Sequence, residues 1–255
     1  MANYVLLHGA WHGAWCWERV AQRLTEAGHT VHLLTFSGTG ERAHLLDLRP
    51  RPKIGFRTHI QDITQFVQMQ DLHDLTIVAH SYAGLPLCGA FATIAAHVRH
   101  LVYMDAFVPI PGRTRVGDLL RVKHPPLWLQ PWVTEMLVQM TRSQPVPPPP
   151  LRFLGVSDPA DHAWVQSHLT PMPLRFLDGL ETLETPPDSL MSYIWCAGSG
   201  DAMGEGFAPF ALYGRQRGWR SFTIDTGHDA MITAPEEVAR ILITIAAPVA
   251  VKERA

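Results

Sequence analysis

A serine lies in the short segment 79–84, of sequence AHSYAG, directly after a continuous apolar run. A serine on a sharp strand-to-helix turn projects its hydroxyl above the sheet, provided that small residues flank it two positions away on each side. Ala79 and Ala83 occupy these two positions. A serine that only caps a helix is the simpler alternative. The apolar strand before the turn favours Ser81 as a nucleophile, with the amide N–H of Tyr82 directed at a developing oxyanion.

A serine hydroxyl becomes a good nucleophile only when a base removes its proton, so a histidine is expected nearby. The chain has 14 histidines. His228 lies in the segment 226–229, of sequence TGHD, between the last strand-like run and a helix that begins at Pro235. A tight loop in that position holds its side chain at the carboxyl edge of the sheet. We therefore predict that His228 is the general base.

An acid must orient this base, and the chain order nucleophile, acid, base predicts a carboxylate after the strand Ser192–Cys196. Asp201 is the first carboxylate beyond that strand and lies in a glycine-rich loop, so we predict it to be the acid. Glu205 in the same loop and Asp105 at the end of the fourth strand are alternatives. A solvated aspartate in a turn is the simpler explanation of Asp201.

A second oxyanion donor is expected from the loop after the first strand, of sequence HGAW at 8–11, because that loop runs beside the serine turn. The amide of Ala10 is the candidate. His8 and His12 are four residues apart, but a glycine follows each of them and no cysteine or carboxylate is close in sequence. We therefore expect no zinc site. The proposed chemistry needs no metal and no organic cofactor.

Short apolar or β-branched runs alternate with helical periods along most of the chain, which is typical of an α/β fold with a mostly parallel sheet and helices on both faces. The expected strands and helices follow from these two periodicities. The strands are Tyr4–Leu7, Thr30–Phe36, Leu75–Ala79, Leu101–Met104, Ser192–Cys196 and Arg220–Ile224, and the helices are Trp17–Ala27, about Thr58–Gln70, the segment from the serine turn to about Ala96, about Phe207–Arg217 and Pro235–Ala246.

Prolines interrupt this alternation, since 15 of the 21 fall between Pro109 and Pro187. Proline fixes the backbone and lacks an N–H, so this region should form short helices and irregular turns with little strand. We predict a cap at 109–190, inserted into a catalytic core formed by 1–108 and 191–255. An apolar substrate pocket under the cap would draw on aromatic and methionine side chains, or these side chains pack in a small core of the cap's own. The candidates are Trp11, Trp128, Trp132 and Met136.

The composition excludes several classes of partner. The 255 residues carry 21 Lys and Arg against 23 Asp and Glu, a net charge of −2 that does not favour nucleic acid or an anionic membrane surface. Three widely spaced cysteines give no disulfide framework, and no run of 18 apolar residues is present. We expect a cytoplasmic protein that acts on a small molecule. A monomer and a homodimer both remain open.

Together these motifs resemble the α/β-hydrolase superfamily, within it the branch of plant methylesterases, plant hydroxynitrile lyases and related bacterial serine carboxylesterases. The motifs are the segments 8–10, 13–17 and 38–42, the Ser81 turn and Gly227-His228. The resemblance implies an α/β-hydrolase fold with a helical cap and a triad of Ser81, His228 and an acid. It also implies an oxyanion hole from the amides of Ala10 and Tyr82.

Two departures distinguish this chain from the lyases of that branch. The lyases have threonine where Gly9 stands, and a lysine after the catalytic histidine where this chain has Asp229. A carboxylate there would repel cyanide, so ester hydrolysis is favoured. We expect a serine carboxylesterase for small to medium-sized hydrophobic or aromatic esters. A hydroxynitrile lyase or another non-hydrolytic lyase or cyclase is one alternative, and a ligand-binding protein with weak or lost turnover is another.

Overall fold

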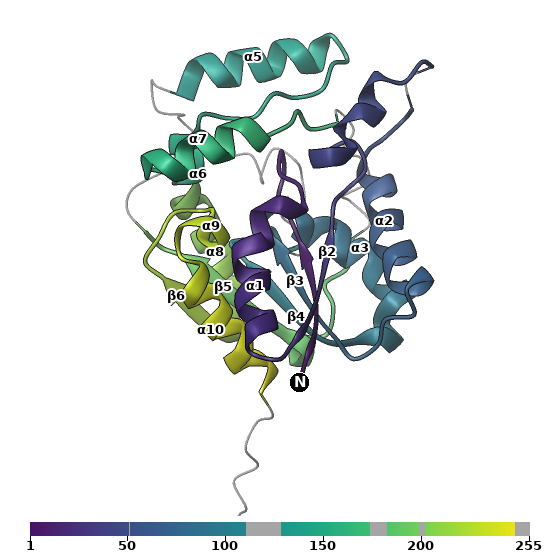
Figure 1. Cartoon of the computed structure of the whole chain (residues 1–255), viewed down its shortest axis with the longest axis vertical. Coiled ribbons are helices and arrows are strands. Elements are labelled where there is room, and N and C mark those ends of the chain that lie inside the picture. The colour runs from purple at the N-terminus through teal and green to yellow at the C-terminus, as the bar shows by residue number, and fades with distance from the viewer. Residues whose placement is uncertain (51, 111–128, 174–182, 199–201, 248–255) are drawn as a thin grey trace, which may run out of the picture.

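A computed structural model describes residues 1–50, 52–110, 129–173, 183–198 and 202–247 (Figure 1). Within them, six strands form one parallel sheet in the order β2-β1-β3-β4-β5-β6. The predicted mostly parallel sheet of an α/β fold is thereby confirmed. The strands are β1 Asn3–Leu7, β2 Thr30–Leu34, β3 Leu75–His80, β4 Val98–Met104, β5 Met191–Cys196 and β6 Arg220–Ile224.

Both faces of this sheet are covered by helices, because neighbouring strand residues point to opposite faces and are apolar on each. In β1, Tyr4 and Leu6 pack in one buried cluster, and Val5 and Leu7 pack in the other. The first cluster lies under α1 Glu18–Glu26, α9 Ala230–Thr233 and α10 Pro235–Ala246. The second lies under α2 Phe56–Met69, α3 Gly84–Ile94 and α8 Ala202–Gln216.

The order of the strands decides where a site can form. The chain runs from β1 outward to β2 and then returns to β3 on the other side of β1, so the loops after β1 and β3 diverge at the carboxyl edge of the sheet. Ligands of open α/β sheets bind at such a switch point. The predicted oxyanion loop and the serine turn follow these two adjacent strands.

Three helices of the proline-rich region lie beyond the carboxyl edge (Figure 1). They are α5 Gln130–Thr141, α6 Leu151–Leu154 and α7 Pro159–His168. The region has one isolated bridge, Val146 to Met172, among its described residues, in line with the low strand content that its prolines predict. The boundaries 109–190 of a separate cap remain a prediction.

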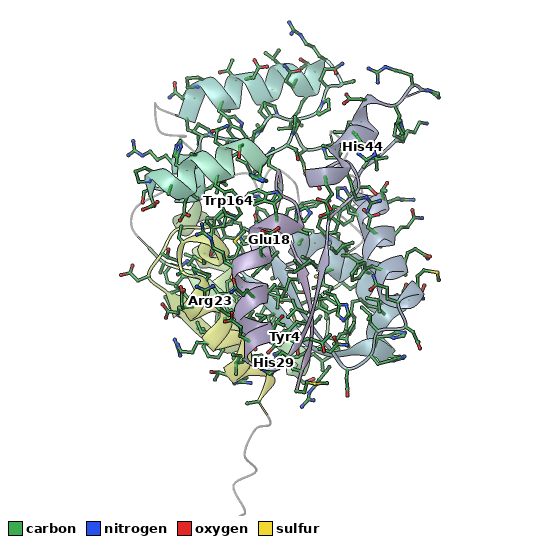
Figure 2. All side chains as sticks on the ribbon, viewed as in Figure 1. Tyr4, Glu18, Arg23, His29, His44 and Trp164 are labelled. Carbon is green, nitrogen blue, oxygen red and sulfur yellow. The ribbon has the colours of Figure 1, made fainter. Side chains whose placement is uncertain are left out.

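Helix α7 is attached to the first core helix through an arginine. The guanidinium of Arg19 forms an ion pair of 2.6 Å with Asp161 and lies 4.8 Å from the ring centre of Trp164. Figure 2 shows Trp164 above the start of α1, close to Glu18. These contacts fix one end of the proline-rich region against the core.

Most expected elements are found within one or two residues, and two helices begin earlier than expected. Helix α2 begins at Phe56 because the Thr58 hydroxyl accepts the free amide of Gly55. Helix α8 begins at Ala202, so the expectation of a loop up to Glu205 was wrong. Packing of the apolar side of α8 on the sheet outweighs the low helix propensity of its glycines. Short 3-10 helices cover Ala14–Trp17, Gly40–Asp47, Ser81–Ala83, Ala95–His97 and Asp188–Leu190.

Among the described helices, none combines the length and the apolar character needed to cross a membrane.

Candidate functional site

Ser81 occupies a strained turn between β3 and α3. Its φ is 53°, in the left-handed region that residues with a side chain avoid, and its side chain is buried. The carbonyl of Ser81 accepts a hydrogen bond of 3.1 Å from the amide of Phe107, which ties the turn to the loop after β4. A strained residue held in this way is common where a side chain must be aimed. The turn has the conformation that a serine nucleophile requires.

His228 is paired with Asp105. The Nδ1–H of His228 donates a hydrogen bond of 2.7 Å to Oδ2 of Asp105, and both side chains are buried. The other carboxylate oxygen of Asp105 accepts the amide of Cys196 at 3.2 Å. The ring of Phe207 stacks on a face of the His228 imidazole, with 4.9 Å between ring centres. The His228 ring is therefore fixed, with its Nδ1 bonded to Asp105 and its Nε2 outside that bond.

The expectation that Asp201 orients His228 is corrected by this pairing, because the Nδ1 position is taken by Asp105. Asp201 itself lies outside the described residues. Glu205 lies in α8 rather than in a loop, and its side chain is outside the description. Asp105 also stands between Ser81 and His228 in the chain, as the predicted order requires of an acid. It follows β4 and not β5.

A close approach of two backbones brings His228 across the end of β5 to reach Asp105. The amide of Gly198 donates to the carbonyl of Thr226 at 2.9 Å. A Cβ on Gly198 would lie 2.3 Å from the carbonyl carbon of Thr226, so only glycine allows this contact. The loop of the base can therefore fold over β5 toward the end of β4.

The loop after β1 lies against the serine turn. A Cβ on Gly9 would lie 2.9 Å from Cβ of Ser81. The Nε2 of His8 accepts the amide of Phe36 at 3.1 Å, so its Nδ1 carries the proton and donates to the Gly9 carbonyl at 2.7 Å. Because the N–H of Ala10 is trans to that carbonyl in the same peptide plane, His8 fixes the direction of the predicted oxyanion donor.

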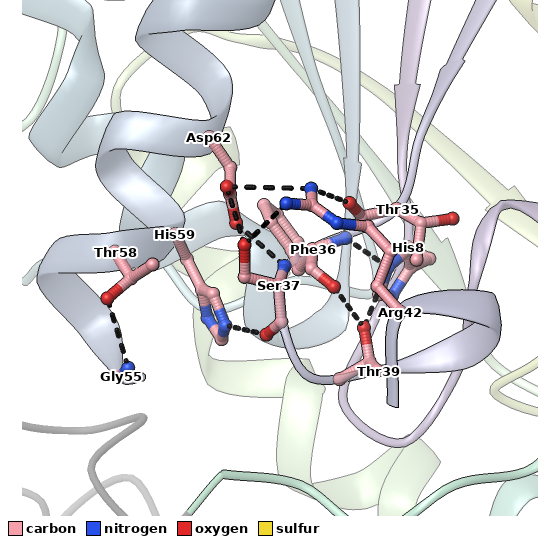
Figure 3. A network of polar contacts seen from close by, with 10 residues as sticks. All are labelled: His8, Thr35, Phe36, Ser37, Thr39, Arg42, Gly55, Thr58, His59 and Asp62. Atoms are coloured by element: carbon pink, nitrogen blue, oxygen red, sulfur yellow. Dashed lines mark hydrogen bonds and ion pairs between the residues drawn. The ribbon is translucent and has the colours of Figure 1, made fainter. Parts of the chain in front are cut away.

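Tyr82, which carries the other predicted donor, is held by a second histidine. Its hydroxyl lies 2.7 Å from Nδ1 of His59, and Nε2 of His59 lies 3.0 Å from the carbonyl of Ser37. Since a carbonyl only accepts, Nε2 carries the proton and Nδ1 accepts from Tyr82. Figure 3 shows His8 and His59 on opposite sides of the strand end that carries Phe36 and Ser37.

A third histidine, His80, holds the loop of the base. Its Nε2 donates a hydrogen bond of 3.1 Å to the main-chain carbonyl of His228, and the two imidazole rings are 4.5 Å apart. Since His80 precedes Ser81, this bond joins the base loop directly to the serine turn. This hydrogen bond holds the loop of His228 next to the turn of Ser81.

Burial keeps these three histidines neutral. It lowers the pKa of His8 to about 3 and that of His59 to about 4, and it moves the pKa of His80 well below the usual value. His12 differs: burial lowers its pKa, but the charge and the hydrogen bond of Asp229, together with the hydrogen bond to Ala10, outweigh burial and raise the pKa above its usual value. The site therefore combines several neutral imidazoles with one that favours the charged form.

These pKa shifts predict a loss of stability in acid. In the unfolded chain His8, His59 and His80 take up protons near pH 6.5, whereas in the folded chain the pKa is about 3 for His8, about 4 for His59 and well below the usual value for His80. Their contribution is complete above pH 6.5 and falls as the pH drops, by ~1.4 kcal/mol per pH unit for each histidine that stays neutral. We expect urea unfolding to show a decline of about 3 kcal/mol per pH unit between pH 6 and 4.5 from His8 and His59, to which His80 adds.

The control is His44→Gln, which replaces an exposed histidine and should leave the slope unchanged. A free energy of unfolding that stays constant between pH 7 and 4.5 would show that these histidines are not held neutral.

The structure brings two of the predicted pocket residues together. The rings of Trp11 and Trp132 are 5.8 Å apart, and their indole N–H groups donate to the carbonyls of Val146 and Pro147. Met136 is half-buried and packs against the core cluster that contains Tyr82. Trp128 lies outside the described residues. A substrate pocket beside Trp11 remains a prediction.

One group of side chains in the described residues is compact enough to hold a metal ion, namely His80, His228 and Asp229, whose ligand atoms lie within 4.8 Å of one another. Three of their atoms already have protein partners: Nε2 of His80, Nδ1 of His228 and Oδ2 of Asp229. These bonds hold the three side chains in place, and the expectation that the chemistry needs no metal stays a prediction.

The sequence patterns missed the roles of His8, His12, His59 and His80. Each lies in the site because of contacts with residues distant in the chain, as with Tyr82 and His59, 23 positions apart. The one available signal was the position of these histidines in the sequence: His8 and His12 lie at the predicted oxyanion loop, and His80 lies beside the predicted serine turn.

Comparisons with known proteins agree with the fold. A model of the alpha/beta hydrolase family matches residues 4–241. The carbendazim hydrolyzing esterase of Nocardioides sp. (strain SG-4G) is 33% identical over 96% of this chain and 100% of that protein. Methyl jasmonate esterase 1 of Vitis vinifera is 30% identical over 43% of this chain and 41% of its own length.

A solved structure shows the same architecture. The extracellular alpha/beta-hydrolase from a Paenibacillus species has a TM-score of 0.71 to this chain, covers 96% of it and 98% of its own length, and is 20% identical. At this identity the likeness is one of fold.

Proposed function

Because the chain belongs to the alpha/beta hydrolase family, we propose that it is a serine carboxylesterase for small to medium-sized hydrophobic or aromatic esters. The chain is a hydrolase, and the two relatives named above are esterases. The observation that carries the proposal is the buried hydrogen bond of 2.7 Å between His228 and Asp105. His80 joins the loop of His228 to the turn of Ser81.

In the proposed mechanism Ser81 attacks the ester carbonyl, and its hydroxyl proton passes to Nε2 of His228. Asp105 holds the imidazole in the tautomer that can accept this proton and stabilises the imidazolium that forms. Collapse of the tetrahedral intermediate returns the proton to the alcohol, which leaves an acyl group on Ser81. A water molecule then attacks the acyl carbonyl with the same assistance from His228, and the carboxylic acid is released.

The oxyanion of each tetrahedral intermediate would be stabilised by the amides of Ala10 and Tyr82. Donors held in place before the reaction contribute most, and loss of one typically costs ~3 kcal/mol of barrier. The bond from His8 to the Gly9 carbonyl and the bond from Tyr82 to His59 support such fixed donors.

The substrate class is inferred from the surroundings of the site. The indoles of Trp11 and Trp132, with Met136 of the same helix as Trp132, favour an apolar or aromatic group beside the reacting ester. The relative that aligns over its whole length is named for hydrolysis of carbendazim, so carbendazim is a reasonable probe.

The test is turnover of p-nitrophenyl acetate, p-nitrophenyl butyrate and carbendazim by the purified full chain. We expect saturable hydrolysis of at least one of them, and one equivalent of a fluorophosphonate should bind and abolish it. Mandelonitrile cleavage is measured in parallel as the assay for a lyase. Mandelonitrile turnover without ester hydrolysis, or no labelling and no turnover at all, would contradict the proposal.

A further inference from the structure

The buried side chain of His12 lies between two acceptors. Its Nδ1 is 2.7 Å from the carbonyl oxygen of Ala10, and its Nε2 is 3.1 Å from Oδ2 of Asp229. A carbonyl and a carboxylate can only accept, so both ring nitrogens must carry hydrogen. This arrangement makes His12 an imidazolium and Asp229 its carboxylate partner, with side chains only 1% and 0% exposed.

The two contacts of His12 join separate parts of the site. Ala10 carries the proposed oxyanion donor, and Asp229 directly follows the proposed base His228. Trp11, between Ala10 and His12, has a φ of 65°, which is unfavourable for a residue with a side chain. Such a conformation persists when strong contacts hold it, and hydrogen bonds from a charged donor are about twice as strong as neutral ones.

We propose that His12 and Asp229 form a positioning pair, whose opposite charges hold the oxyanion loop and the loop of the base in register. The pair contacts no reacting atom. The proposal rests on the proposed esterase function, because it assigns the pair an effect on the hydrolytic step.

In the part of the chain that the structure describes, Asp229 is the one charged group that acts on His12. The titratable groups that face it from the neighbouring elements are the imidazoles of His8, His80 and His228 and the thiol of Cys16. Burial keeps His8 and His80 neutral, and it also raises the pKa of Cys16, which keeps the thiol protonated. The ring of Trp15 stacks on His12 at 5.3 Å between centres and shields it from solvent.

The charge state of the pair sets the direction of its pH dependence. The pKa of His12 is raised, so the imidazolium persists to a higher pH than that of an ordinary histidine and is lost as the pH rises through the shifted value. Loss of that proton removes the donor to either Ala10 or Asp229. We therefore expect kcat to fall at alkaline pH through loss of the pair.

The first experiment needs no variant. Nitrogen-15 NMR of the labelled full chain at pH 7 should show both ring nitrogens of His12 protonated. A neutral His12 at this pH, with the proton on Asp229 instead, would overturn the proposal.

The second experiment measures ester hydrolysis by His12→Asn and Asp229→Asn. Asparagine at position 12 can still donate to the carbonyl of Ala10 but carries no charge. We expect each variant to lower kcat on the order of tenfold to a hundredfold with KM changed less than about twofold, since misplacement of a donor acts on the transition state. His168→Asn is the matched control, because this exposed imidazole contacts Trp15 from outside the pair.

The double variant and the pH profile separate a pair from two independent structural residues. If the residues act together, the double variant loses no more kcat than either single variant, whereas multiplied losses would overturn the proposal. In Asp229→Asn the alkaline fall of kcat should move to lower pH, because the carboxylate no longer favours the imidazolium. An unmoved profile would contradict the proposed pair.

These outcomes are distinct from failure of the esterase proposal. A wild-type chain with no ester turnover and no fluorophosphonate labelling would refute the esterase. An active wild type with His12→Asn and Asp229→Asn as active as His168→Asn would refute the positioning pair alone. If the variants do not fold, the NMR measurement on the wild type still decides whether the ion pair exists.

Discussion

Replacement of Ser81 by alanine is expected to lower kcat for ester hydrolysis by about 10⁴-fold or more, because no other group takes over the covalent step. The variant should also lose all labelling by a fluorophosphonate. The fold should be retained, since alanine is smaller than serine and adopts the same backbone. Steady-state kinetics with p-nitrophenyl butyrate, together with intact-protein mass spectrometry after labelling, checks both outcomes.

Ser81→Gly gives an independent check on the strained turn. Glycine adopts a φ of 53° without the penalty that a side chain incurs, so this variant should be as inactive as Ser81→Ala but more stable by about 1 kcal/mol. Ser167→Ala removes an exposed hydroxyl and should leave activity unchanged. Substantial hydrolysis by Ser81→Ala would refute the proposed nucleophile.

Asp105→Asn is expected to lower kcat by about 10⁴-fold with little change in KM. In the wild type Oδ1 of Asp105 accepts the amide of Cys196, and Oδ2 accepts the Nδ1–H of His228. An asparagine that keeps its oxygen on the Cys196 amide presents an NH₂ group to His228. The imidazole must then accept at Nδ1 and carry its proton on Nε2, where it cannot receive the serine proton.

Asp201→Asn and Glu205→Gln are the matched comparisons, because these carboxylates were the other candidates for the same role. Each should retain most of the wild-type kcat, because Asp105 already holds the Nδ1 of His228 that an acid must orient. If Asp201→Asn abolished hydrolysis while Asp105→Asn remained active, the assignment of the acid would have to return to the loop after β5. Circular dichroism of all three variants shows whether each is folded.

The positions of Ser81 and His228 were predictable because their signals are local. An apolar strand, a serine and a small-residue helix in immediate succession describe one turn, and the segment of His228 describes another. Parallel strands place such turns at the same edge of a sheet. The carboxylate that orients His228 could not be identified from local signals, because Asp105 and Asp201 both stand between Ser81 and His228 in the chain.

Asp105 lies beside His228 because of the path of the loop that carries His228. His228 is 123 positions away in the chain, and it reaches Asp105 because Gly198 lets the backbone of Thr226 pass at the end of β5. The roles of the buried histidines have the same origin. The bond between His8 and Phe36 and the pairing of His12 with Asp229 each join residues from different strand ends.

The sequence by itself therefore determined the fold class, the serine turn and the loop of the base, because periodicity and short-range spacing specify elements and turns. The tertiary structure was needed to show which carboxylate faces His228, which histidines burial keeps neutral, and which one pairs with a carboxylate. The physical reason is that the pKa and the hydrogen-bond partners of a buried group depend on neighbours from distant segments, and the neighbours are known only once the strands are ordered.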